Sequence, residues 1–222
     1  MSNLNEQYND FSSEFSQITE KANQASIEAL HKTIDFSLNN KKVLDIGSGD
    51  GSDLLKLQEK GAEVYGIDAS EEMIKLAQEK NPKGNFQLGL FDLIPYEGEF
   101  FDIVISKYAI QTSEEIEPIF KEVSRVLKSG GIFIYLVVHP FRQFIEKKKE
   151  KKDYFKKEIV DSILFQGRLI VHEPTHTMKE YLSDLFFKNF EMISYDEKFD
   201  EDAEKINDDV YPAFFIIKAR KK

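Results

Sequence analysis

The stretch KKVLDIGSGDGSDLLKL, residues 41–57, decides how this chain folds. Its apolar run at 42–46 is typical of a buried strand, and the run ends in three closely spaced glycines, Gly47, Gly49 and Gly51. A pattern with helical spacing follows the glycines directly. A strand that turns through glycines into a helix presents backbone N–H groups to a nucleotide-type ligand. The sequence therefore predicts a nucleotide-binding turn at this point.

The charges around the glycines separate two kinds of ligand. Dinucleotide enzymes carry G-x-G-x-x-G, whereas here Ser52 stands in the place of the last glycine. Asp45 and Asp50 flank the turn, and carboxylates disfavour a pyrophosphate but suit a ligand with a cationic end. Asp68, at the end of the second apolar strand, fits a ribose diol with either ligand. The pattern favours S-adenosylmethionine, which has an ammonium and a sulfonium and no phosphate, over NAD.

Strands and helices alternate through the middle of the chain. Beyond the first strand and a helix at 51–60, strands are expected at 63–67, 86–90, 101–106 and 132–138, and helices at 71–80 and 113–127. The strands are apolar almost throughout, so both faces of the sheet must be covered. The predicted fold class is α/β, a Rossmann-like doubly wound sheet with helices on both faces.

The two ends of the chain depart from this alternation. Residues 6–38 are predicted to form two helices, the first with Tyr8, Phe11 and Phe15 on one face. Residues 141–175 are rich in lysine and aromatic residues and are interpreted as an irregular inserted flap. A capping box at Thr177–Glu180 opens a helix through Phe187, and strands follow at 190–195 and 213–219. We therefore expect one domain, 1–222, made of a helical segment (1–40), a cofactor-binding core (41–140), the flap (141–175) and closing elements (176–222).

Composition narrows the chemistry and the partners. The chain has 222 residues and no cysteine, so neither a thiol nucleophile nor a disulfide is available. Its net charge of −10 argues against a nucleic-acid partner. The polar N-terminal decapeptide does not have the pattern of a signal peptide, and no apolar run is long enough to span a bilayer. A cytoplasmic location is expected.

Four stretches carry a resemblance to a known family. VLDIGSGDG, VYGIDASEEMIKLAQ, FDIVIS and RVLKSGGIFIYLVVHP resemble the successive motifs of class I S-adenosylmethionine-dependent methyltransferases, closely over residues 41–140. The resemblance implies a seven-stranded sheet that is mostly parallel, with the last strand antiparallel. It also implies the cofactor-binding residues: Asp45, Gly47, Ser48 and Gly49 around the methionine end, Asp68 at the ribose, and Ala69 and Met73 near the adenine.

The chain departs from the family at the adenine end. Relatives often carry an aspartate that accepts from the adenine amino group, and Leu90 stands in its place here. We expect Asp92, or the backbone at Phe91, to replace it. The resemblance also implies that residues Ser106 to Tyr108, after the fourth strand, lie beside the transferable methyl. His139 follows the fifth strand at the same edge of the sheet, and His139 and Tyr108 are the candidate catalytic bases.

The stretch HEPTH at 172–176 matches the H-E-x-x-H motif of zinc proteases. That motif needs both histidines on one face of a continuous helix, and Pro174 disrupts a helix between them. The predicted capping box also starts its helix only after the motif. No metal site is expected from it.

The expected function is transfer of a methyl group from S-adenosylmethionine to a small-molecule nucleophile bound under the flap. Lysines at 147–157 would make an anionic acceptor favourable. Two alternatives remain open at this point. The chain could bind the cofactor without turnover, as a silent or scaffold protein on the same fold, or it could be an NAD-dependent oxidoreductase, which Ser52 and Asp45 disfavour.

Overall fold

The structure, a computed structural model, describes residues 12, 16, 24–164, 169–199 and 208–222. The helical face predicted for Tyr8, Phe11 and Phe15 lies outside these residues. The helix predicted next along the chain is present as α3 (Gln24–Thr33), which buries Ile27 and Leu30.

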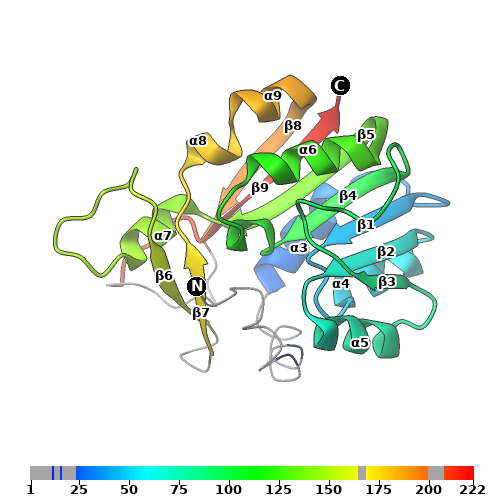
Figure 1. The fold of residues 1–222 in the computed structure, drawn as a ribbon, viewed down its shortest axis with the longest axis horizontal. Helices are drawn as coiled ribbons and strands as arrows, with labels where there is room; N and C mark the ends of the chain where they lie inside the picture. Colours follow the sequence, from blue (N-terminus) through cyan, green and yellow to red (C-terminus); the bar gives the residue numbers. More distant parts are fainter. Residues whose placement is uncertain (1–11, 13–15, 17–23, 165–168, 200–207) are drawn as a thin grey trace.

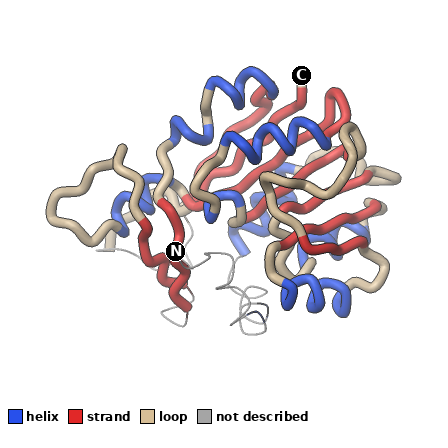
Figure 2. The backbone as a smooth tube through the Cα atoms, in the orientation of Figure 1, coloured by secondary structure: helices blue, strands red, loops and turns tan. Residues whose placement is uncertain are grey.

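A seven-stranded sheet with the order β3-β2-β1-β4-β5-β9-β8 forms the centre of the molecule (Figures 1 and 2). Its strands are β1 (Lys42–Ile46), β2 (Glu63–Asp68), β3 (Asn85–Leu88), β4 (Phe101–Lys107), β5 (Leu127–Val138), β8 (Phe190–Lys198) and β9 (Phe214–Lys221). Neighbouring strands from β3 to β5 pair in parallel, and β9 pairs antiparallel with both β5 and β8. The predicted fold class, with the last strand antiparallel, is confirmed.

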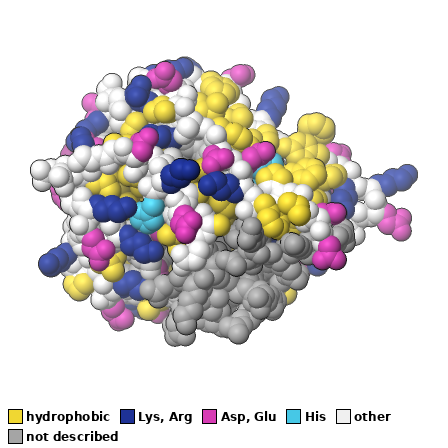
Figure 3. All heavy atoms as spheres, turned by 180° about the vertical axis from the view of Figure 1, so that it is seen from behind, with side chains coloured by type: hydrophobic (Ala, Val, Ile, Leu, Met, Phe, Trp, Pro, Cys, Tyr) yellow, Lys and Arg dark blue, Asp and Glu magenta, His cyan; other side chains and the backbone are white. Residues whose placement is uncertain are grey.

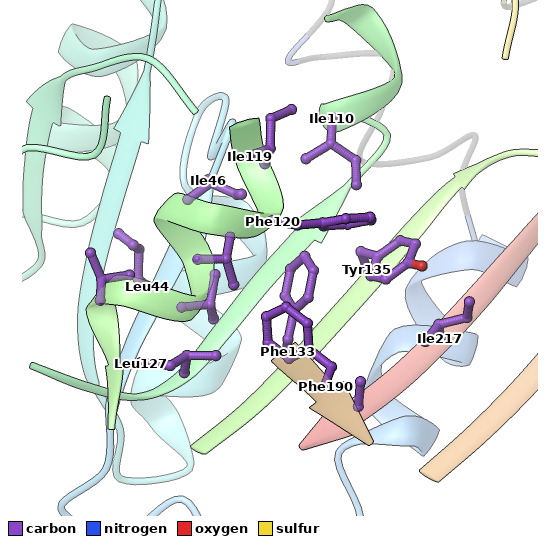
Figure 4. Close-up of a cluster of buried hydrophobic side chains, with 14 of the residues drawn as sticks. Leu44, Ile46, Ile110, Ile119, Phe120, Leu127, Phe133, Tyr135, Phe190 and Ile217 are labelled. Atoms are coloured by element: carbon purple, nitrogen blue, oxygen red, sulfur yellow. The ribbon is translucent and has the colours of Figure 1, made fainter. Parts of the chain in front are cut away.

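Helices cover both faces of this sheet (Figure 1). The helices α3, α4 (Ser52–Glu59) and α5 (Glu71–Lys80) pack on one face, and α6 (Glu117–Val126), α8 (Met178–Tyr181) and α9 (Asp184–Asn189) pack on the other. Alternate residues of each strand enter opposite layers: Phe133 and Tyr135 of β5 join Phe120 of α6 (Figure 4), whereas Ile134 joins Leu30 of α3. This alternation explains why the strands are apolar throughout.

Three predicted elements differ in their boundaries from the structure. The helix expected at 113–127 starts later, as α6 at Glu117, because Pro118 occupies its first turn, and a 3₁₀ turn, η1 (Ile110–Thr112), precedes the expected start. The strand expected at 132–138 starts earlier, at Leu127, and accommodates Gly130 in the left-handed region at φ 73°. The helix expected from Thr177 has its capping box, but it ends at Tyr181, and Ser183 caps the separate helix α9.

The described residues of the segment 141–175, which are 141–164 and 169–175, include regular elements where the sequence predicted an irregular flap. It contains most of α7 (Pro140–Glu146) and an antiparallel pair of strands, β6 (Ile159–Leu164) and β7 (Leu169–Pro174). The pair lies beside the main sheet and does not join it (Figure 1). Gln143 of α7 anchors it, because its amide donates to Glu173 and to the carbonyl of Pro174 and accepts from the N–H of His176.

Candidate functional site

The candidate site lies at the carboxyl ends of β1, β2 and β4. The chain leaves β1 and β4 in opposite directions across the sheet, which makes their junction the switch point where open α/β folds bind ligands. A cavity of about 340 Å³ lies there. Its lining includes Asp45, Gly47, Ser48, Gly49, Asp68, Ala69, Met73, Phe91 and Tyr108, nine of the twelve residues that the sequence singled out.

The glycine turn lines one side of this cavity. Gly47 has φ 78°, and a Cβ at this position would lie 2.2 Å from Cβ of Ala109, so only glycine fits without displacing the chain after β4. Gly49 also has a positive φ, of 51°, but a Cβ there would meet nothing within 4 Å. The turn therefore packs tightly against Ala109 at Gly47, whereas Gly49 has free space beside it on the side of the cavity.

Asp68, at the end of β2, is held in one orientation by the backbone. Its Oδ2 accepts from the N–H of Gly49 at 2.9 Å, and its Oδ1 accepts from the N–H of Ser70 at 2.9 Å. Burial raises the pKa of Asp68, and these N–H donors lower it in part. Each carboxylate oxygen keeps a lone pair for a further donor, so Asp68 can accept from two neighbouring hydroxyl groups at once.

Asp45, at the end of β1, is buried without a partner for one of its oxygens. Among the described residues, nothing donates to Oδ1 of Asp45 or to Oγ of Ser48. Burial raises the pKa of Asp45 well above its ordinary value; the charges of Asp53 and Asp68 raise it further, and Lys107 opposes them. A buried carboxyl group with an unused acceptor is costly unless a donor, best a cationic one, reaches it from the cavity.

Asp50 differs from Asp45, although the sequence argument treated the two acids alike. Its Oδ2 lies 2.5 Å from Nζ of Lys80, and its Oδ1 accepts from the N–H of Ser52. Burial alone would raise the pKa of Asp50, but the hydrogen bonds from Lys80, Ser16 and Ser52 outweigh it and hold that pKa below its usual value. The charge of Asp50 is already balanced within the protein, so Asp45 carries the argument for a cationic ligand.

The apolar end of the cavity is formed by Ala69, Met73 and Phe91. Met73 is buried, and its N–H donates to Oγ of Ser70 at the start of α5. Asp92 and Leu90, by contrast, are exposed and are absent from the cavity lining. Of the two residues expected to replace the missing aspartate, the structure thus brings Phe91 to the cavity and leaves Asp92 outside it.

The residues that end β4 face in alternate directions. Ser106 is fully buried and its Oγ donates to the carbonyl of Ile46 at 3.1 Å, so its side chain holds β4 to β1 and does not line the cavity. Lys107 and Tyr108 do line it. Tyr108 has φ 54°, a region that side chains rarely adopt, while its N–H donates to Leu136. Backbone held in this region is typical of functional sites.

His139 does not line the cavity, and both of its ring nitrogens are engaged. Nδ1 accepts from the N–H of Phe141 at 3.0 Å and so caps α7. Nε2 therefore carries the proton of the neutral ring, and it lies 3.2 Å from Oε2 of Glu197. Burial lowers the pKa of His139, with Glu197 acting in the opposite direction. In this arrangement the neutral imidazole has no lone pair left with which to take a proton.

The HEPTH stretch lies on β7 and the loop that follows it, so its histidines do not share a helix face. His172 is exposed and pairs with Asp161, whereas His176 is buried with Nε2 3.0 Å from the carbonyl of Gln111. Within the described part of the chain, no group of three or more His, Asp and Glu residues could hold a metal ion. The described residues likewise include no helix with the length and apolar character that crossing a bilayer requires.

Comparison with known proteins gives a consistent result. A family model described as a methyltransferase domain matches residues 44–135. YqeM of Bacillus subtilis, assigned as a methyltransferase, is 37% identical over 119 residues, which cover 50% of this chain and 48% of YqeM. The demethylmenaquinone methyltransferase of Chlorobaculum parvum is 36% identical over 92 residues, 40% of this chain and 38% of that enzyme. The chain thus spans about half the length of the first of these relatives and less of the second.

Solved structures resemble the chain over more of its length. A protein of Listeria monocytogenes assigned as an S-adenosylmethionine-dependent methyltransferase superimposes with a TM-score of 0.73 and 27% identity, covering 90% of this chain and 100% of that one. A methyltransferase of Mesorhizobium loti, at 21% identity and a TM-score of 0.70, shares the fold over 90% of this chain and 97% of its own. The fold and these matches together show that the chain is similar to class I S-adenosylmethionine-dependent methyltransferases.

The cavity fits the cofactor of that family. Asp68 presents two fixed acceptors for a ribose diol, the unpaired oxygen of Asp45 suits the methionine ammonium, and the apolar end suits an adenine ring. Lys107 also lines the cavity, within the stretch from Ser106 to Tyr108 that was expected beside the transferable methyl. Asp53 and Thr112 line it as well and were not predicted. Strand alternation separates Lys107 from Ser106, because a strand that buries Ser106 must turn its next side chain the other way.

Proposed function

We propose that this protein transfers the methyl group of S-adenosylmethionine to a small-molecule nucleophile. The observation that carries the proposal is the buried, unpaired Oδ1 of Asp45, which lies in the same cavity as the ribose-type acceptor Asp68. S-adenosylmethionine supplies a methyl group already activated on a sulfonium. The work left to the chain is to hold the acceptor in line with that methyl and to exclude water.

Tyr108 is the residue that we assign to the acceptor side. It lines the cavity at the end of β4, beside Ala109 and Thr112, and its ring packs edge-on against Phe214 of β9. Between the two candidate bases, its position in the cavity favours Tyr108 over His139, whose nitrogens are both occupied. A phenol there can accept a hydrogen bond from an acceptor hydroxyl or amine and orient its lone pair.

We further propose that the acceptor carries an anionic group and that Arg142 binds it. Several of the lysines expected to attract an anion already have partners in the protein: Lys147 donates to two carbonyls, Lys148 and Lys149 pair with carboxylates of their own segment, and Lys157 pairs with Glu180. Arg142 is 12% exposed, and among the described residues its guanidinium makes one hydrogen bond, from Nε to Glu146 at 3.0 Å. Its terminal nitrogens are left for a bidentate anion, within electrostatic reach of Tyr108 and Tyr211.

The names of relatives support a small acceptor, since one is a demethylmenaquinone methyltransferase. A net charge of −10 favours a small molecule over nucleic acid, and the face in Figure 3 shows acidic and basic side chains interspersed rather than a basic surface. We also propose a cytoplasmic location, with which the absence of cysteine is compatible.

Methyl-labelled S-adenosylmethionine tests the proposal. Small-molecule extracts are separated by ion exchange into anionic, neutral and cationic fractions, and each is incubated with the protein. Label should appear in the anionic fraction and should be lost with Arg142→Met, while cofactor affinity stays unchanged. Cofactor binding with no label in any fraction would favour the silent binding protein, and label confined to the cationic fraction would contradict the role of Arg142.

A further inference from the structure

Lys107 is a cationic side chain in the cavity that the glycine turn does not explain. It ends β4 with 17% of its side chain exposed, and its Nζ lies 2.5 Å from Oδ2 of Asp53 on α4. We propose that Lys107 binds the carboxylate of the methionine end of the ligand while Asp45 binds its ammonium, so that the two residues together recognise a free α-amino acid group. This inference rests on the proposed function, because it assumes that S-adenosylmethionine occupies the cavity.

The register of the sheet brings the two residues to one side. Asp45 of β1 is paired in parallel with Ile105 of β4, and paired residues of parallel strands point to the same face. Lys107 lies two residues beyond Ile105 and so projects to that face as well. It is the face that α3 and α4 cover, because Ile105 packs in the same cluster as Leu30 and Leu54. Asp45, Lys107 and Asp53 therefore meet where the glycine turn opens.

The charges at this point are complementary to a zwitterion. No described residue donates to Oδ1 of Asp45. Lys107 has three N–H donors, and its contact among the described residues is the ion pair with Asp53. The titratable groups near Lys107 include Asp53 from α4, Asp45 from β1 and His31 from α3. An ammonium entering beside Asp45 relieves the excess of negative charge, and a carboxylate can then share Lys107 with Asp53.

A second lysine in the cavity, Lys56 on α4, offers a comparison. It lies one helical turn further from the glycines than Asp53, and it projects from α4 rather than from the strand edge where Asp45 sits. Lys107 is the more favourable anchor because its neighbour Asp45 fixes the ammonium on the same strand edge. Lys56→Met is therefore the matched control for Lys107→Met: each change removes one lysine charge from the same cavity.

Calorimetry with two ligands isolates the carboxylate. The ligands are S-adenosylhomocysteine and its decarboxylated analogue, which keeps the adenosine, the sulfur and the amine. The unaltered protein should bind S-adenosylhomocysteine at least about tenfold more tightly, as expected for a charge-assisted contact in a partly buried site. Lys107→Met should reduce that preference to near one, while Lys56→Met should keep it and Lys107→Arg should retain most of it.

The outcomes separate this inference from the function on which it rests. If the unaltered protein binds neither ligand, the proposed function fails. If it binds both equally, or if Lys56→Met removes the preference and Lys107→Met keeps it, the cofactor assignment stands and the role of Lys107 is wrong. An equal loss of affinity for both ligands in Lys107→Met would show that the lysine only holds Asp53 and the shape of the site. If Lys107→Met does not fold, equal binding of the two ligands by the unaltered protein would still contradict the role of Lys107.

Discussion

Asp68 and Asp45 are two carboxyl groups at neighbouring strand ends whose surroundings give them different tasks. The backbone N–H groups of Gly49 and Ser70 fix both oxygens of Asp68, whereas one oxygen of Asp45 has no donor within the described structure. A carboxylate whose orientation is fixed selects ligands by the positions of their donors. A buried carboxylate that lacks a hydrogen-bond donor selects ligands by their positive charge. The first suits a ribose diol and the second an ammonium.

Replacement of Asp68 should weaken cofactor binding through the loss of a charged acceptor. We expect Asp68→Ala to cost about 1–3 kcal/mol of binding free energy, measured by calorimetry with S-adenosylhomocysteine. Asp68→Asn is the control, because an amide keeps the shape and one acceptor oxygen and should lose less. An Asp68→Ala protein that folds and binds as tightly as the original would remove Asp68 from the site.

The raised pKa of Asp45 predicts that cofactor affinity depends on pH. A cationic ligand group favours the charged carboxylate, so binding releases a proton wherever Asp45 is protonated in the free protein. Affinity should therefore rise with pH and level off above the raised pKa of the free protein. Titrations between about pH 5 and pH 8 in two buffers of different ionisation enthalpy report the proton released. Asp45→Asn should abolish the release, and an unaltered protein with flat affinity and no release would contradict the assignment.

Much of the site could be read from the sequence because it lies in the turn that the motif describes. The sequence could not predict the surroundings of three residues, Ser106, Asp92 and His139. The orientation of Ser106 depends on strand phase, the exposure of Asp92 depends on where β3 stops, and the ring of His139 is committed to the helix that it caps. The role proposed for Lys107 beside Asp45 depends on the register of β1 and β4, which requires the structure.

At the scale of elements, the inserted segment is more ordered than its composition suggests. Lys147 is buried, and its Nζ donates at 2.6 Å to the carbonyls of Asp153 and Lys156, which closes residues 147–158 into a loop. Burial lowers the pKa of Lys147. The seven lysines at 147–157 are typical of a solvent-exposed segment. The hydrogen bonds of Lys147, however, join the two ends of the loop, and local sequence patterns do not reveal such contacts.

Removal of the Lys147 ammonium should loosen that loop without disturbing the main sheet. Phe155 is 84% exposed on the loop and offers a chymotrypsin site. We expect Lys147→Met to speed chymotryptic cleavage after Phe155, because the carbonyls of Asp153 and Lys156 lose their shared donor and the loop opens locally. Lys151→Met, an exposed lysine of the same loop, should leave the rate unchanged. Equal rates for the two variants would show that Lys147 does not hold the loop closed.

The main sheet was more predictable than the insertion for a physical reason. Strands buried on both faces and helices with one apolar face leave a strong periodic signal, as β1, β2 and α5 do. The paired strands β6 and β7 belong to a separate two-stranded sheet with partly exposed residues such as Ile159 and Ile170, so their signal is weak. Polar contacts around Gln143 hold that sheet in place.

At the scale of the whole molecule, the sheet order determines where chemistry can occur. The glycine turn, Asp68 and Lys107 come from three different strands, yet parallel pairing of β2, β1 and β4 brings their ends to one edge. The antiparallel strand β9 extends the sheet beyond β5 and brings Phe214 against Tyr108. The proposed cofactor side and the proposed acceptor side of the cavity thus meet at the end of β4.

Calorimetric titration of the unaltered protein with S-adenosylhomocysteine, and in parallel with NAD, distinguishes a methyltransferase site from a dinucleotide site. We predict one S-adenosylhomocysteine bound per chain and no heat of binding with NAD, because the carboxylates of Asp45, Asp50, Asp53 and Asp68 line the cavity and would repel a pyrophosphate at the glycine turn. Saturable binding of NAD, or no binding of S-adenosylhomocysteine by a folded protein, would contradict the account.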